Sequence, residues 1–390
     1  MRKISLGEFP FYWRVAESGF DELPIRLPFS FGVQESLPYL VRRQFDQSDL
    51  DILRAMYCLD SNVGYLQESN SLGMAYARDL LRKITTLRHS SASAFSKHPT
   101  PRVLEIGCGG AVVLRSLASD HTSCVGIDPS PIAIQAVQGT EIELISDFFP
   151  NQLNGQRFDF IFNADVLEHV EDPLDFLRVC GDHLVDDGLL LVSVPDCTRS
   201  IRIGDVSMAL HQHLSYFDVE SLKRVFREAG FADVSVEQAE YGGSLYAVGK
   251  KPRSRHDNED PIGNHEQILD QFFQRASSSV SLLETLVKNA LHSQMSVGMY
   301  VPLRALPYLG RDAELRELVS SIRMFDDTPM WRGKRIQQGL SRIEDFSQLI
   351  QNPVDHLFVM SLTFGEIIAR KVASSLGSAV QIEELEALIS

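Results

Sequence analysis

Residues 103–118 read VLEIGCGGAVVLRSLA, and this stretch decides the fold class. A short apolar run is followed by the glycine-rich turn GCGG at residues 107–110, and an apolar helical pattern begins directly after it. Glycines let the backbone turn tightly and approach a ligand closely, while the start of a helix offers free N–H groups. The stretch therefore predicts a strand, a ligand-binding turn and a helix.

The same alternation continues outward from this stretch. Short apolar strands separated by helices predict a mainly parallel sheet that is covered on both faces. We expect strands near 102–107, 123–128, 142–146, 158–164, 188–195, 232–239 and 244–250, and helices near 111–119, 131–138, 173–185 and 218–229. The predicted fold class is α/β, a doubly wound, Rossmann-like sheet of seven strands.

Three predicted domains surround or contain this sheet. Residues 1–96 show two helical patterns, DLDILRAMYCL and AYARDLLRKITTL, and are expected to form a helical cap or substrate region. Residues 97–250 hold the sheet, and the charged segment 251–265 is a predicted linker. Residues 266–390 open with a long helical pattern and continue with strands and helices, so we expect a smaller, Rossmann-like α/β domain there.

The composition excludes several classes of protein. Lys and Arg number 37 against 52 Asp and Glu, a net charge of −15 that repels nucleic acid and anionic lipid. No apolar run is long enough to span a bilayer, and no export signal is visible. The five cysteines are scattered and never form a Cys-x-x-Cys pair, so neither a disulfide framework nor a zinc ribbon is expected. A cytoplasmic location is predicted, while the oligomeric state stays open.

A second motif, CVGIDPSP at residues 124–131, ends a strand on Asp128 about 20 residues beyond the turn. An acid at this spacing accepts hydrogen bonds from the ribose hydroxyls of a nucleoside. The turn reads Glu-x-Gly-x-Gly-Gly and lacks the third glycine of dinucleotide-binding turns. The pair of motifs therefore favours S-adenosylmethionine (SAM), which has no pyrophosphate, over NAD.

Three later segments complete an ordered set: ISDFFP (145–150), FDFIFNADVLEHVEDP (158–173) and LLLVSVPD (189–196). Together with the two motifs above, they resemble the class I SAM-dependent methyltransferases over about 150 residues. The resemblance implies that the glycine-rich turn lines the methionine end of SAM, that the acid of CVGIDPSP holds the ribose, and that ISDFFP contacts adenine. The candidate cofactor-binding residues are Glu105, Gly107, Cys108, Gly109, Asp128, Pro129, Asp147, Phe148, Asn163, Ala164 and Asp165.

Methyl transfer needs alignment of two reactants and a base, and histidine titrates in a useful range. We consider His169, His211 and His213 as bases; the catalytic candidates are His213, His169 and Tyr216. The segment that begins HQHLSYF at residue 211 resembles sugar C-methyltransferases of natural product biosynthesis, which act on nucleotide-linked keto-deoxysugars. In place of the family's Tyr-x-Glu-His this chain has Leu210 and Gln212 before the histidine, and it lacks the family's cysteine-rich zinc module.

Two alternatives remain beside C-methylation of a nucleotide-linked sugar or related small molecule. The stretch DVLEHV at residues 165–170 resembles ubiquinone-pathway O-methyltransferases, in which carboxylates and an imidazole can hold a divalent ion. This chain would then methylate a phenolic or other specialised metabolite, although no metal ligand is assigned here. The other alternative is an inactive methyltransferase-like binding or assembly protein, against which the intact glycine-rich turn and Asp128 argue.

Overall fold

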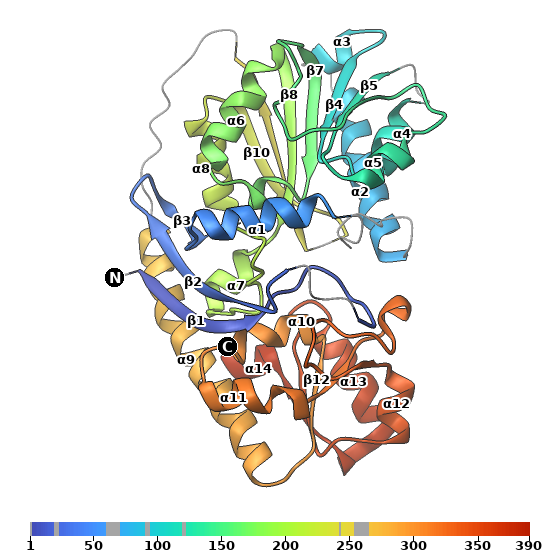
Figure 1. Cartoon of the computed structure of the whole chain (residues 1–390). Helices are drawn as coiled ribbons and strands as arrows, with labels where there is room; N and C mark the ends of the chain where they lie inside the picture. Colours follow the sequence, from blue (N-terminus) through green and yellow to red (C-terminus); the bar gives the residue numbers. More distant parts are fainter. Residues whose placement is uncertain are drawn as a thin grey trace. The chain divides into compact units, whose positions relative to one another are not determined.

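The computed structural model describes residues 2–18, 23–59, 71–89, 94–118, 122–241, 243–252 and 265–390 (Figure 1). The chain divides into two compact units. Unit 1 comprises Met1–Gln47, Cys197–His213 and Asn264–Ser390, and unit 2 comprises Ser48–Asp196 and Leu214–Gly263. The chain passes between the units several times, so this grouping differs from the predicted contiguous ranges.

Unit 2 contains the predicted sheet of seven strands, which confirms the α/β fold class. Its order is β10-β11-β8-β7-β4-β5-β6. The strands β8, β7, β4, β5 and β6 are parallel, and β11 pairs antiparallel with both β8 and β10. Their bounds are β4 (Arg102–Ile106), β5 (Ser123–Ile127), β6 (Glu143–Ile145), β7 (Phe158–Ala164), β8 (Leu184–Pro195), β10 (Ala232–Gln238) and β11 (Ser244–Lys250).

Helices cover both faces of this sheet (Figure 1). One face carries α2 (Ser71–His89), α3 (Ala94–Lys97), α4 (Val112–Ala118) and α5 (Pro131–Ala136), and the other carries α6 (Pro173–Asp182) and α8 (Val219–Glu228). On the first face, Leu80 and Ile84 of α2 share a core with Phe160 and Phe162 of β7. Burial from both sides explains why the strands read as nearly continuous apolar runs.

The N-terminal part of unit 1 differs from the predicted helical cap. It begins with an antiparallel sheet of β1 (Lys3–Pro10), β2 (Arg26–Gln34) and β3 (Leu37–Arg43). Alternate residues such as Leu27, Phe29 and Phe31 of β2 are buried, which is the period of a strand. Prolines within these strands mask the alternation, because proline normally argues against a strand. The predicted helices follow as α1 (Gln47–Tyr57) and α2.

The C-terminal part of unit 1 contains a second, smaller parallel sheet, as predicted. It follows the long helix α9 (His265–His292) and has the order β14-β13-β12-β15-β16. Its inner strands are β12 (Val297–Tyr300), β13 (Arg323–Phe325) and β15 (His356–Val359), and its edge strands are β14 (Ile343–Glu344) and β16 (Gln381–Glu384). The main helices are α10 (Pro302–Ala305), α11 (Ala313–Leu318), α12 (Phe346–Gln351) and α13 (Gly365–Leu376).

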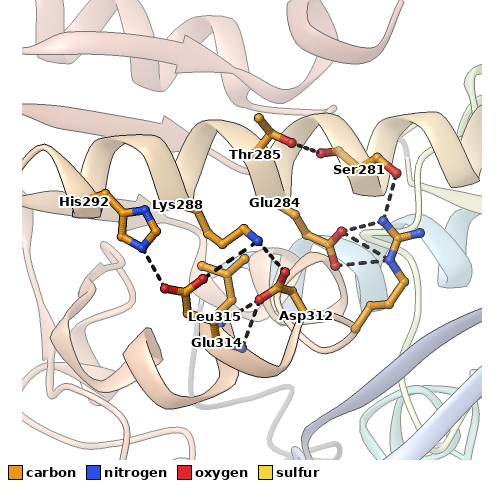
Figure 2. Close-up of polar contacts among 9 residues, drawn as sticks. Ser281, Glu284, Thr285, Lys288, His292, Asp312, Glu314 and Leu315 are labelled. Carbon is orange, nitrogen blue, oxygen red and sulfur yellow. Dashed lines mark hydrogen bonds and ion pairs between the residues drawn. The ribbon is translucent and has the colours of Figure 1, made fainter.

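A row of ion pairs joins α9 to the turn before α11 and to α11 itself (Figure 2). Glu284 is 6% exposed, and its carboxylate accepts hydrogen bonds from the Nε and an Nη group of Arg311. Lys288 Nζ donates to Asp312 Oδ2 at 2.5 Å. Asp312 also caps α11 by accepting two backbone N–H groups. The row therefore fixes the long helix against the C-terminal sheet domain.

The segment Cys197–His213, which follows β8, also belongs to unit 1. It forms α7 (Thr198–Ile203) and a turn built on the fully buried Asp205. Asp205 accepts hydrogen bonds from the hydroxyls of Ser200 and Ser207 at 2.8 Å and from Tyr308 Oη at 2.8 Å. These bonds tie the segment to the C-terminal part of the same unit. In the described part of the chain, no helix is both long and apolar enough to cross a membrane.

Candidate functional site

The glycine-rich turn lies between β4 and α4 in unit 2, as predicted. Gly107 and Gly109 have positive φ angles of 72° and 45°, which residues with a side chain rarely adopt. A Cβ on Gly107 would lie 2.5 Å from Val166 Cγ2. Both glycines are therefore required by the backbone path of the turn.

Asp128 connects this turn to the end of β5. Its carboxylate is 2% exposed and accepts the Gly109 N–H on Oδ2 and the Ser130 N–H on Oδ1, both at 2.8 Å. Each carboxylate oxygen has a second lone pair that these bonds leave open. Asp128 is therefore held rigidly with acceptor capacity to spare, as a ligand for a ribose diol requires.

Two buried polar side chains beside the turn have unsatisfied atoms. Glu105 is 6% exposed, and its Oε2 has no hydrogen-bond partner among the described residues. The same holds for both side-chain polar atoms of the fully buried Asn163. Burial raises the pKa of Glu105 well above its usual value, and the charge of Asp128 adds to the shift. Buried polar groups are normally paired, so these atoms fit a bound polar ligand such as the amino-acid end of SAM.

The predicted adenine contacts follow β6. Asp147 accepts hydrogen bonds from Asn151, Gln152 and the backbone of Phe148, and these bonds lower its pKa. The Phe148 side chain is 38% exposed and faces a cavity. An exposed aromatic ring beside a fixed acid suits a planar base.

The cavity has a volume of about 350 Å³ and lies at the carboxyl edge of the sheet. This is the edge at which doubly wound sheets bind their ligands. It is lined by Leu50, Leu53, Arg54, Tyr57, Ile106, Gly107, Ile127, Asp128, Pro129, Asp147, Phe148, Phe149, Asp165, Val166, His169, Val170, Glu171 and Phe176. The predicted residues Glu105, Cys108, Gly109, Asn163 and Ala164 do not reach the lining in the part of the chain that is described.

An acidic stretch with one imidazole, Asp165–His169, forms one end of the cavity. Asp165 adopts a left-handed conformation, with φ of 55°, and is exposed where it lines the cavity; desolvation by the surrounding protein raises its pKa to about 6. Glu168 is 1% exposed, and neither carboxylate oxygen has a hydrogen-bond partner among the described residues. Burial raises the pKa of Glu168, and the charge of Asp165 raises it further. Glu168 Oε1 lies 3.8 Å from His169 Nε2.

Helix α1 also lines the cavity. Leu50, Leu53 and Tyr57 lie on one helix face and line the cavity. Tyr57 Oη hydrogen-bonds His169 Nδ1 at 2.9 Å. The sequence analysis predicted this helix but missed Tyr57 and the place of the helix in the cavity lining. The spacing of three and then four residues between Leu50, Leu53 and Tyr57 places them on one helix face, and this was the signal available in the sequence.

The structure places His211 in the core of unit 1. His211 is 2% exposed in unit 1, where its Nε2 contacts the Leu27 carbonyl at 3.0 Å. Burial is the main cause that lowers the pKa of His211 to about 3, and the charge of Arg43 lowers it further. His211 is therefore a neutral core residue and not a base. His213 ends the same segment of unit 1, and Tyr216 is 1% exposed and outside the cavity lining. Catalytic roles for His213 and Tyr216 stay predictions.

Comparisons with known proteins agree with this geometry. A family model described as "Methyltransferase domain" matches residues 75–236. The ubiquinone biosynthesis O-methyltransferase of Azorhizobium caulinodans is 31% identical over 144 residues, which are 33% of this chain and 52% of that protein. The mitochondrial enzyme of the same name from Schizosaccharomyces pombe is 30% identical over 119 residues, 28% of this chain and 43% of that protein. The chain thus spans about half the length of the curated relatives it matches.

Among solved structures, the N-methyltransferase NodS of Bradyrhizobium japonicum, in complex with S-adenosylhomocysteine, has a TM-score of 0.37 and 20% identity. The match covers 53% of this chain and 98% of that one. A likeness at this level says nothing about the acceptor. None of these three relatives is named as a sugar C-methyltransferase, so that resemblance stays a prediction.

Proposed function

We propose that residues 75–236, which match the model of a methyltransferase domain, form a class I SAM-dependent methyltransferase domain, and that the chain is an enzyme that methylates an oxygen atom of a small molecule. The observation that carries this proposal is the His169–Tyr57 pair at the cavity that also contains Asp128. The curated relatives are named as O-methyltransferases, and this favours oxygen over carbon as the acceptor atom. The nucleotide-linked sugar remains the second candidate.

The unsatisfied polar atoms beside the turn support SAM as the cofactor. Glu105 would hold the ammonium group of its methionine end, and Asp128 would hold the ribose diol. When bound, SAM supplies an electrophilic methyl group. Pairing with a cation would compensate the desolvation of the buried Glu105 carboxylate, which raises its pKa. The acidic lining as a whole suits a cationic ligand.

His169 would remove the proton from an acceptor hydroxyl. If Nδ1–H donates to Tyr57 Oη, Nε2 carries the lone pair that would accept that proton. Glu168, 3.8 Å from Nε2, would stabilise the imidazolium that results. The hydroxyl oxygen forms a bond to the methyl carbon, the carbon–sulfur bond breaks, and sulfur keeps its electron pair. Glu168 and His169 could alternatively supply two of the ligands of a divalent ion.

Product analysis tests this proposal. The enzyme would be incubated with SAM labelled on the methyl carbon and with a panel containing a catechol, a primary amine and a thymidine-diphosphate keto-deoxysugar. We expect the label on a catechol oxygen, with turnover lost in His169→Gln and S-adenosylhomocysteine binding retained. A label on a sugar carbon would transfer the proposal to the second candidate. A protein that fails to bind S-adenosylhomocysteine would support the inactive alternative.

A further inference from the structure

Arg54 is a cation in a cavity whose other charged side chains are mostly acids. Within the described part of the chain, it is the one arginine or lysine side chain that lines the cavity of unit 2. The lining also contains the imidazole of His169 and four acids, which are Asp128, Asp147, Asp165 and Glu171. Acids suit the sulfonium and ammonium groups of SAM, and these groups give no reason for an arginine. The function proposed above assigns no role to Arg54.

Arg54 lies on the face of α1 that lines the cavity. Leu50, Leu53 and Tyr57 line it too, and the spacing of these four residues is that of one helix face. Cβ atoms three residues apart on a helix are about 5–6 Å from each other. Tyr57 hydrogen-bonds His169, the proposed base. An acceptor that reaches His169 beside Tyr57 is therefore within reach of the long Arg54 side chain.

The present partner of Arg54 leaves most of its guanidinium available. Among the described residues, Arg54 pairs with Asp51, through Nη1 and Oδ1 at 3.5 Å. Both side chains are largely exposed, at 58% and 64%, and an ion pair of this kind contributes little to stability. A guanidinium has five N–H donors, of which this pair uses one. A ligand can therefore engage Arg54 without breaking a contact that the fold needs.

The cavity also offers a surface for a flat, apolar ligand. Phe149 and Phe176 both line it, with their ring centroids 5.3 Å apart, and Val166 and Val170 line it as well. Aromatic and aliphatic side chains of this kind suit an aromatic ring. A guanidinium binds a carboxylate through two parallel hydrogen bonds, which fix the orientation of the ligand. The lining thus combines a surface for a ring with one guanidinium and one imidazole.

We propose that Arg54 binds a carboxylate of the methyl acceptor and thereby selects a hydroxylated aromatic acid over its neutral counterpart. This proposal rests on the O-methylation proposed above and adds the chemical class of the acceptor. The carboxylate pairs with the guanidinium of Arg54, while the acceptor hydroxyl gives its proton to His169. The carboxylate itself is unchanged by the reaction. Arg54 therefore determines specificity and orients the acceptor.

SAM carries a carboxylate as well, so the experiment must separate the two sources of this group. If Arg54 bound the carboxylate of the cofactor, Arg54→Gln would weaken the binding of S-adenosylhomocysteine, which has the same group. We expect the affinity of this variant for S-adenosylhomocysteine to stay within about threefold of the wild type.

Calorimetric titration of the full chain, saturated with S-adenosylhomocysteine, tests the selection. The probes are 3,4-dihydroxybenzoate, catechol and 3,4-dihydroxybenzylamine, which share the catechol ring and differ in charge. The wild type should bind the acid about fivefold more tightly than catechol, or better, because this is the upper size of an exposed ion pair. The amine should bind more weakly than catechol, because its charge repels that of Arg54.

Two variants and one control assign this preference to Arg54. Arg54→Gln should bind the acid and catechol equally, with the affinity for catechol unchanged. Arg54→Glu should reverse the order, so that the amine binds more tightly than the acid. Arg178→Gln removes an exposed arginine of α6 that lies outside the cavity lining, and it should bind all three probes like the wild type.

Four results would each overturn the proposal. They are the absence of saturable binding by the acid, equal binding of the acid and catechol by the wild type, and a preference for the acid that persists in Arg54→Gln. The fourth is a loss of S-adenosylhomocysteine affinity beyond about threefold in Arg54→Gln, which would assign Arg54 to the cofactor.

Product analysis with methyl-labelled SAM distinguishes this failure from a failure of the proposed function. A label on the oxygens of catechol and of the acid, at equal rates, would uphold O-methylation and contradict the role of Arg54. The absence of label on the oxygens of both compounds would contradict O-methylation, whatever the binding titrations show.

Discussion

Replacing Asp128 with asparagine should weaken cofactor binding and destabilise unit 2 at the same time. The carboxylate accepts two backbone N–H groups at 2.8 Å, one on each oxygen. An asparagine has one oxygen, so it can accept only one of them and turns its NH₂ group toward the other donor. A charge-assisted hydrogen bond contributes about 1.5–3 kcal/mol, and an unpaired buried donor costs a similar amount. The expected loss of stability is about 2–4 kcal/mol.

The effect on affinity follows from the lost charge. Two ribose hydroxyls would donate to a neutral amide oxygen at best, instead of a carboxylate. Loss of roughly 1.4–2.8 kcal/mol corresponds to about 10–100-fold weaker binding of S-adenosylhomocysteine. At about 2–4 °C per kcal/mol, the stability loss lowers the melting temperature by about 4–16 °C.

Calorimetric titration and thermal unfolding measure the two effects separately. Glu141→Gln, which removes one exposed negative charge from the same unit, serves as the matched control and should change neither quantity. A variant with a lowered melting temperature but an affinity within threefold of the wild type would refute the ribose role of Asp128. An unchanged melting temperature would also contradict the bonding described for its carboxylate.

Three further predictions concern the base, the pH dependence and the α9 ion pairs. His169→Gln should lower the rate of S-adenosylhomocysteine formation about 10²–10⁴-fold, and Tyr57→Phe should lower it less, both with unchanged cofactor affinity. Asp165 is neutral below its pKa of about 6 and charged above it. SAM carries a positive sulfonium that S-adenosylhomocysteine lacks, so a newly charged Asp165 in the cavity lining should raise the affinity ratio of SAM over S-adenosylhomocysteine between about pH 5 and 7. A flat ratio in the wild type would show that Asp165 does not act on the bound sulfonium. Glu284→Gln leaves the Arg311 guanidinium without its carboxylate and should lower the free energy of unfolding by about 2 kcal/mol. The exposed Glu266→Gln should lower it by under about 0.5 kcal/mol.

The raised pKa of Asp165 also affects the stability of the ligand-free protein. An acid that binds its proton more tightly in the folded state than in the unfolded chain stabilises the fold at low pH, and solvent access to Asp165 makes this contribution small. This contribution is lost as the pH rises through about 6, and Asp165→Asn should remove the dependence. Melting temperatures of the ligand-free wild type and the variant, measured across this pH range, provide the check. A wild-type melting temperature that rises with pH relative to that of the variant would contradict the prediction.

The parts of the site that were predictable depend on neighbours in the sequence. Gly107, Gly109 and Asp128 occupy turns directly after strands, so the periodicity that locates the strands also locates these residues. Tyr57 and His169 lie 112 positions apart and meet only when α1 reaches the sheet edge. Nothing in the local pattern of either residue indicates its partner.

The misassigned parts have equally specific causes. Strands β1 to β3 contain prolines that local propensity treats as breaks, although the alternation of Leu27, Phe29 and Phe31 was present. His211 is of a residue type that often serves as a catalytic base, but its packing against Phe9, Phe11 and Phe29 makes it a core residue. Residue type alone does not distinguish a buried imidazole from a reactive one.

The bonding of Asp205 limits how this gene can be divided. A fragment that ends near residue 250 would include Asp205 but not Tyr308, whose hydroxyl pairs with it in the intact chain. The carboxylate would lose this bond and its apolar surroundings at once, and the segment around α7 would present its buried face to solvent. We expect such a fragment to be recovered intact only together with residues 265–390, supplied on a second polypeptide. Domain swaps within this protein should therefore exchange Cys197–His213 together with the C-terminal part.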